Sequence, residues 1–145
     1  MQLRTEIEIL APKSAVWKVL ADFPGYAEWN PFIPFISGEQ RSGSRLEIIL
    51  SPPDGREMTI RPTLVTFEPE AELRWRGHLL HPAVFQGIHF FKLTELEPNR
   101  TRLTHGEDFS GFLVKFLSSV FTKAARGFVF MNQALKKRVE GAGPR

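Results

Sequence analysis

Two histidines and one glutamate, His89, His105 and Glu107, have types and spacing that could support chemistry. They flank the segment Glu97-Pro98-Asn99, whose composition is typical of a hairpin loop between two strands. A three-residue loop there sets a register in which His89 faces Glu107 across the strands and His105 faces Phe91. Side chains alternate along a strand, so these groups share the leucine-rich face that must be interior. The pattern therefore predicts three ionisable groups on an apolar face.

Three interpretations fit this cluster. In the first, His89 and Glu107 form a buried hydrogen-bonded pair that is important only for the structure. In the second, the cluster is the polar end of a pocket that binds a carbonyl, hydroxyl or carboxylate on an apolar molecule. In the third, two histidines and a carboxylate bind a metal or exchange protons with an enolisable substrate. The first two are favoured, so His89, His105 and Glu107 stay candidates, and no catalytic residue, metal or cofactor is assigned.

Several classes of function are excluded or disfavoured by what the chain lacks. It has no His-Glu-x-x-His, Gly-x-Ser-x-Gly or Gly-x-Gly-x-x-Gly motif. It has no cysteine, which excludes disulfides, thiolate nucleophiles and cysteine-based metal sites. The net charge is only +3 and the basic residues are scattered among acidic ones, so nucleic-acid binding is not expected. No apolar stretch approaches the roughly 18 residues of a membrane span, so we expect a cytoplasmic protein without stable membrane insertion.

The elements that position the cluster follow from the periodicity of the sequence. Alternation over residues 3–9 predicts a first strand, and two short helices follow, the first ending near Asp22. Six further strands are predicted over residues 35–41, 45–51, 57–68, 72–79, 85–97 and 101–111. One long helix with an apolar stripe is predicted over residues 112–140.

Short connections between the strands permit only antiparallel neighbours. We therefore expect an α+β fold, in which a curved seven-stranded antiparallel sheet wraps around the long C-terminal helix. The two short helices lie between strands one and two. The length of 145 residues predicts a single domain over residues 1–140 with a flexible tail at 141–145, as a monomer or homodimer.

Bending such a sheet around one helix is expected to leave a hollow, and the 13 phenylalanines predict that its walls are apolar. Trp29 lies where a lid would cover the mouth of this hollow. Gly127 in the last helix indicates either close packing or space for a ligand. The candidate ligand-binding residues are Trp29, Trp75, His89, Phe91, His105, Glu107, Phe109, Phe121, Phe128 and Met131.

Several stretches, taken together, carry a resemblance to a known family. They are Ala11-Pro12, Val16-Trp17, Leu20-Ala21-Asp22-Phe23, and residues 26–33, 73–77, 87–91, 101–111 and 128–136. In these stretches the sequence resembles the SRPBCC or START-like superfamily, including its pollen-allergen-like and polyketide cyclase/dehydrase-like members. The resemblance covers nearly the whole chain and implies the helix-grip fold.

This resemblance implies a deep cavity for a small hydrophobic ligand, such as a lipid, a quinone, or a polyketide-like or aromatic molecule. Such relatives include lipid carriers, hormone receptors and ring-closing enzymes, so the fold does not fix the activity. The main hypothesis is a binding or carrier protein without catalytic activity. The alternatives are a cyclase or dehydratase that uses His89, His105 and Glu107, and a protein-interaction scaffold.

Overall fold

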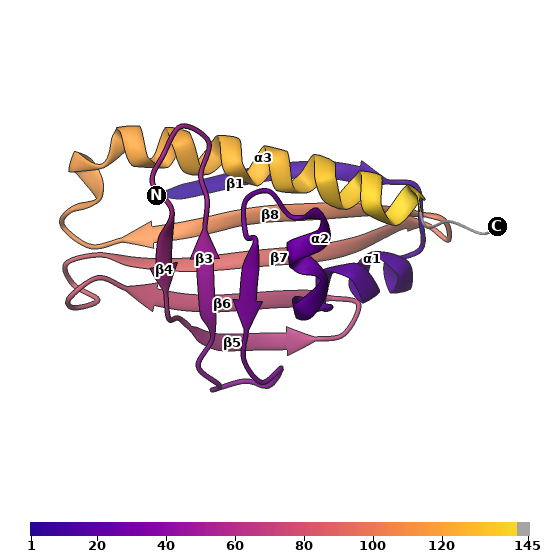
Figure 1. Cartoon of the computed structure of the whole chain (residues 1–145), viewed down its shortest axis with the longest axis horizontal. Coiled ribbons are helices and arrows are strands. Elements are labelled where there is room, and N and C mark those ends of the chain that lie inside the picture. Colours follow the sequence, from indigo (N-terminus) through magenta and orange to yellow (C-terminus); the bar gives the residue numbers. More distant parts are fainter. Residues whose placement is uncertain (142–145) are drawn as a thin grey trace.

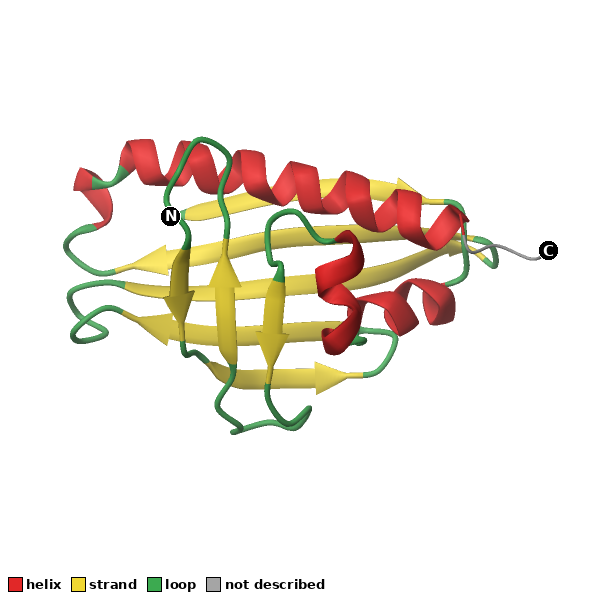
Figure 2. Ribbon diagram, in the orientation of Figure 1, coloured by secondary structure: helices red, strands yellow, loops and turns green. Residues whose placement is uncertain are grey.

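The computed structural model describes residues 1–141, and Figures 1 and 2 show its arrangement of helices and strands. The elements are β1 (Gln2–Ile9), α1 (Lys13–Leu20), the 3-10 turn η1 (Phe23–Gly25), α2 (Tyr26–Trp29), β2 (Phe35–Ser37), β3 (Glu47–Leu50), β4 (Met58–Ile60), β5 (Thr63–Glu68), β6 (Glu72–His78), β7 (Gln86–Glu97), β8 (Arg100–Ser110), the 3-10 turn η2 (Val114–Phe116) and α3 (Ser118–Gly141).

The strands form two antiparallel sheets. One has five strands in the order β1-β8-β7-β6-β5, and the other has three in the order β2-β3-β4. The long helix α3 runs beside β1 and β8, and α1 and α2 lie toward its C-terminal end (Figure 1). The structure thus confirms the α+β class, the antiparallel pairing, the two short helices and the long C-terminal helix. The chain has the START-like helix-grip fold.

The expected single sheet of seven strands is instead two sheets with eight strands within residues 1–141. The predicted strand over residues 57–68 is interrupted at Arg61 and Pro62, because proline has no N–H to donate to a neighbouring strand. The two sheets remain joined at this break. Leu46 N donates to Pro62 O at 2.8 Å, and Leu64 N donates to Ser44 O at 2.8 Å.

The long helix begins later than the sequence predicts. Gly111 turns the chain with φ of 108°, after which the N–H groups of Phe112 and Leu113 bond to the carbonyls of Ala83 and Val84. These bonds tie the chain to the β6–β7 loop, so α3 starts only at Ser118. At its other end α3 includes Gly141, which was expected in the tail, and residues 142–145 lie outside the described part of the chain.

The short helices seal one end of the core. Val16, Trp17 and Leu20 are the buried residues of α1. The hydroxyl of the fully buried Tyr26 donates a hydrogen bond of 2.5 Å to Leu20 O. Burial raises the pKa of Tyr26 well above its ordinary value, so the phenol remains a donor. No helix within residues 1–141 is long and apolar enough to cross a membrane.

Candidate functional site

The predicted register of β7 and β8 is confirmed. His89 pairs with Glu107, Phe91 with His105, and Gly87 with Phe109. The turn itself differs from the expectation, because Glu97 pairs with Arg100 across a two-residue loop. The additional residue is taken up as a shift in register between Glu95 and Glu97, so the pairs further along the strands are unchanged.

A continuous chain of hydrogen bonds crosses the interior from β8 to β1. Glu107 Oε1 lies 3.1 Å from His89 Nδ1, and His89 Nε2 lies 2.7 Å from His105 Nε2. His105 Nδ1 lies 2.8 Å from Asn132 Oδ1 on α3. Asn132 Nδ2 donates to Thr5 Oγ1 on β1 at 2.8 Å. The chain therefore links two neighbouring strands, the long helix and the edge strand.

The direction of these bonds is set from the Thr5 end. The Thr5 hydroxyl donates to His105 O at 2.7 Å, so its oxygen accepts from the Asn132 amide. The amide oxygen of Asn132 then accepts from His105 Nδ1, which leaves Nε2 of a neutral His105 as an acceptor. His89 consequently donates from Nε2 and, when neutral, accepts at Nδ1. The proton between His89 and Glu107 then belongs to the carboxyl group.

Burial supports this neutral arrangement. It lowers the pKa of His89 to about 3, because the charged imidazolium loses its hydration. It also lowers the pKa of His105, and the neighbouring His89 lowers it further. Burial, helped by the negative charge of Asp108, raises the pKa of Glu107 to about 8. Near neutral pH the three groups are therefore all uncharged.

Aromatic rings enclose both imidazoles. Trp75 stacks on His89 with ring centroids 5.0 Å apart. His105 lies between Phe91 and Phe128, with centroids 4.2 Å and 4.4 Å away. The sequence predicts a hollow around the histidines. In the structure this space is instead occupied by side chains from β6, β7 and α3.

The carboxyl group of Glu107 lies at the end of this packed region, and its side chain is 20% exposed to solvent. Its second oxygen, Oε2, lies over Gly87, where a Cβ atom would lie only 2.2 Å away. The ring of Phe109 lies against the same glycine. Phe109 also contacts Phe85 and Phe121, with centroids 5.7 Å and 4.5 Å away, and we call these three residues the phenylalanine trio.

The structure brings most, but not all, of the candidate residues together. Trp75, His89, Phe91, His105, Glu107 and Phe128 form one cluster, and Phe109 and Phe121 border it through the phenylalanine trio. Met131 is fully buried in the core. Trp29 packs on Tyr26 at 5.2 Å, and none of the ring contacts within residues 1–141 joins it to the histidines.

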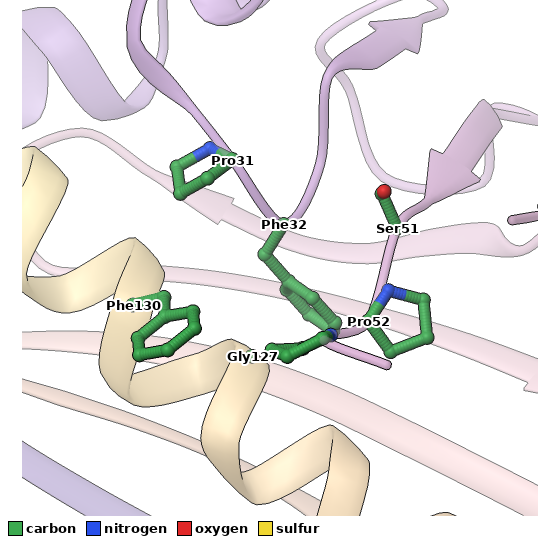
Figure 3. A pocket seen from close by; sticks show the side chains of 7 residues that line it. Pro31, Phe32, Ser51, Pro52, Gly127 and Phe130 are labelled. Carbon is green, nitrogen blue, oxygen red and sulfur yellow. The ribbon is translucent and has the colours of Figure 1, made fainter. Parts of the chain in front are cut away.

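Two hollows lie beside α3, and none of the candidate ligand-binding residues lines either of them. One, of about 160 Å³, is bounded by Pro31, Phe32, Ser51, Pro52, Pro53, Gly127 and Phe130 (Figure 3). The other, of about 250 Å³, is bounded by Thr5, Ala125, Arg126, Val129 and Phe130. Gly127 serves close packing, because a Cβ atom there would lie 2.4 Å from the ring of Phe32.

Four participants were not identified from the sequence: Thr5, Phe85, Gly87 and Asn132. Asn132 follows Phe128 by four residues on the buried stripe of α3, and a polar residue on such a stripe is a usable signal. Thr5 shares the inward face of β1 with Leu3, Ile7 and Ile9, and it pairs with His105. Within residues 1–141, no group of three or more histidine and acidic side chains is arranged to hold a metal ion.

Comparison with known proteins agrees with this architecture. The family model described as "Polyketide cyclase / dehydrase and lipid transport" matches residues 1–140. The fold is similar to that of the ZhuI aromatase/cyclase from Streptomyces sp. R1128, with a TM-score of 0.78, 19% identity, and coverage of 97% of this chain and 93% of that one. A START superfamily protein from Mycobacterium smegmatis gives a TM-score of 0.77 at 19% identity, covering 98% and 99% of the two chains. No curated protein matches the sequence.

Proposed function

The chain belongs to the polyketide cyclase/dehydrase and lipid transport family, and from this premise we propose that it binds a small apolar molecule that carries a hydroxyl group. The observation that carries the proposal is the position of Glu107. Its Oε1 is held by His89, and its Oε2 lies beside the phenylalanine trio. A polar atom at the edge of an apolar region is the usual arrangement for orienting a hydrophobic ligand.

The hydrogen-bond chain determines what Oε2 recognises. While the carboxyl proton lies on Oε1 toward His89, Oε2 is a carbonyl oxygen and accepts a hydrogen bond. If the proton moves to His89, Oε2 belongs to a carboxylate and accepts a stronger one. In both states Oε2 is an acceptor, so the matching ligand group is a donor such as a phenol or an alcohol.

The phenylalanine trio supplies the apolar part of the proposed site. Phe109 and Phe121 are buried, and Phe85 is half-buried beside them. Phenylalanine has no polar atom, so its ring can exchange contacts with a ligand without breaking a hydrogen bond. We propose that the ligand turns these rings aside and takes the place of the Phe109 ring against Gly87.

A matched pair of probes tests this proposal: 2-naphthol, which has a hydroxyl donor, and 2-methoxynaphthalene, which has none. Calorimetry should show that the protein binds 2-naphthol about three- to tenfold more tightly, the value of one net hydrogen bond. Glu107→Gln should keep this preference, because its amide donates to His89 and its oxygen still accepts. Glu107→Leu should lose it. Failure of both probes to bind, or an unchanged preference in Glu107→Leu, would contradict the proposal.

A second candidate is a cyclase or dehydratase in which Glu107 exchanges protons with the substrate. What favours it is the burial of the Glu107 carboxyl group, which raises its pKa to about 8, because acid–base catalysts work best when their pKa lies near the working pH. Glu107→Gln separates the two functions. It keeps the hydrogen bonds but cannot exchange a proton, so it should abolish turnover of a poly-β-ketone substrate while leaving binding nearly unchanged.

A further inference from the structure

The end of the molecule at which α3 begins carries a group of exposed apolar side chains. Two segments meet there, the β6–β7 loop and the chain from the end of β8 into the first turn of α3 (Figures 1 and 2). We define the apolar end surface as Leu79, Leu80, Phe112, Phe116 and Val120, each of which is exposed. The most exposed are Leu80 at 86% and Phe116 at 69%. Contiguous exposure of such residues usually marks an interaction site.

The two segments form one surface because backbone hydrogen bonds join them. Phe112 N donates to Ala83 O at 3.1 Å, and Leu113 N donates to Val84 O at 3.1 Å. Gly111 permits this approach, since a Cβ atom there would lie 2.5 Å from Val84 O. The two backbone segments that carry the exposed side chains are therefore held together.

Backbone strain at the tip also favours a role for this surface. Leu80 has φ of 66°, in the left-handed region that a leucine rarely adopts. The strained conformation is found at the most exposed apolar side chain of the surface. Strain of this kind collects at functional sites more often than elsewhere.

The charges around the apolar end surface are mostly positive. Residues 73–94 and 109–139, which include both segments, contain no aspartate or glutamate. Lys115 lies over the ring of Phe116 at 5.2 Å, and Lys123 follows on the first turns of α3. Of the acidic residues on adjoining segments, Asp54 pairs with Arg126 at 3.0 Å, and Asp108 accepts a hydrogen bond from Gln2 at 2.6 Å.

We propose that the apolar end surface docks on an anionic lipid surface. Apolar side chains beside lysines match the two layers of such a surface, the acyl boundary and the negative headgroups. If a second copy of the chain docked here, its Lys115 and Lys123 would approach those of the first copy, and the like charges would repel. A stable protein interface also buries about 800 Å² per partner, which is more than five partly exposed side chains provide. This inference is independent of the proposed ligand.

Vesicle flotation tests the proposal directly. The protein should float with vesicles of equal parts phosphatidylcholine and phosphatidylglycerol, and at least about tenfold less with pure phosphatidylcholine. The double variant Leu80→Ser and Phe116→Ser should bind the anionic vesicles at least about tenfold more weakly. The matched control is Leu10→Ser, a leucine that is 64% exposed at the far end of β1, and it should bind like the parent protein.

A charge variant separates the electrostatic contribution of the lysines from the contribution of the apolar side chains. Lys115→Gln with Lys123→Gln should weaken binding to the anionic vesicles by about tenfold or more and change binding to pure phosphatidylcholine little. Absence of vesicle binding, or equal losses in the control, would overturn the proposal. So would a dimer in sedimentation velocity that the Leu80→Ser and Phe116→Ser variant dissociates, because the surface would then be an interface between two copies.

Discussion

Gly87 lies directly beneath the carboxyl group of Glu107, so that a methyl group on Gly87 would come within 2.2 Å of Oε2. The glycine therefore provides the space in which the carboxyl group reaches His89. Its partner across β6 and β7 is Gly77, where a Cβ atom would meet only Pro62 at an ordinary distance of 3.6 Å. A Cβ atom would therefore be excluded at Gly87 but accommodated at Gly77, so substitutions at these two paired glycines can be compared directly.

We expect Gly87→Ala to displace the Glu107 carboxyl group and break its bond to His89. The loss leaves a buried imidazole nitrogen without its partner and should cost about 1–3 kcal/mol in the free energy of unfolding. Gly77→Ala should be neutral or slightly stabilising, because alanine restricts the unfolded chain more than glycine does. Urea unfolding of both variants measures the difference, and equal effects would contradict the role assigned to Gly87.

The contribution of Glu107 to stability should fall as pH rises from 4.5 to about 8 and level off above 8. The pKa of Glu107 is about 8 in the folded protein against an ordinary value of 4.5, so between these values the unfolded chain has released a proton that the folded chain keeps. Unfolding is favoured increasingly as pH rises, by up to about 1.4 kcal/mol per pH unit. Thermal unfolding should show this decline from pH 6.5 to 8 and a plateau from pH 8 to 9, and Glu107→Gln should remove the decline.

The histidines should produce the opposite slope in acid. Folding lowers the pKa of His89 from 6.5 to about 3, and it also lowers the pKa of His105. Below pH 6.5 the unfolded chain therefore binds protons at these histidines that the folded chain does not bind. Stability is then lost as pH falls below 6.5. Two imidazoles outweigh the one carboxyl group, so the melting temperature should be highest near pH 6.5. A melting temperature that keeps rising down to pH 5 would contradict the neutral histidines.

Asn132 should be important for stability although it lies on an apolar stripe. Asn132→Leu keeps the branched shape and the number of side-chain heavy atoms but removes both hydrogen bonds, to His105 at 2.8 Å and to Thr5 at 2.8 Å. We expect a loss of about 2–4 kcal/mol, since two buried polar groups lose partners. The matched control is Met131→Leu, an apolar exchange at the adjacent buried position, which should cost less than about 1.5 kcal/mol.

Gly127→Ala tests close packing between α3 and the chain before β2. Alanine favours a helix by about 1 kcal/mol, but its methyl group would meet the ring of Phe32, which packs against Phe128 at 5.5 Å. We expect a net loss of about 1–3 kcal/mol from overpacking. Adding Phe32→Leu to Gly127→Ala should recover part of this loss in a double-mutant cycle, whereas simple additivity would argue against the contact.

The pairing of His89 with Glu107 could be predicted from the sequence because strand alternation and one hairpin determine it. The turn prediction was wrong in detail, but the bulge near Leu96 left the later pairs in the same register. The division of the sheet was missed although Pro62 marks it, because the surrounding residues keep the pattern of a strand.

Other parts of the site depend on contacts between distant segments. Asn132 and Thr5 are 127 residues apart, and only the packing of α3 on β1 brings them together. The aromatic composition predicts an apolar interior, but composition does not determine whether Trp75, Phe91 and Phe128 line a space or fill it. In the folded chain they stack on the histidines instead.

The position of Asn132 also bears on how α3 can move. A helix held only by apolar side chains can roll on a sheet with little loss, because such contacts have no preferred direction. The amide of Asn132 is directional and joins two strands, so advancing the helix by one residue, about 100° of roll, would break both of its bonds. Space beside the phenylalanine trio must therefore open by rotation of the aromatic side chains themselves, while α3 stays in place at Asn132.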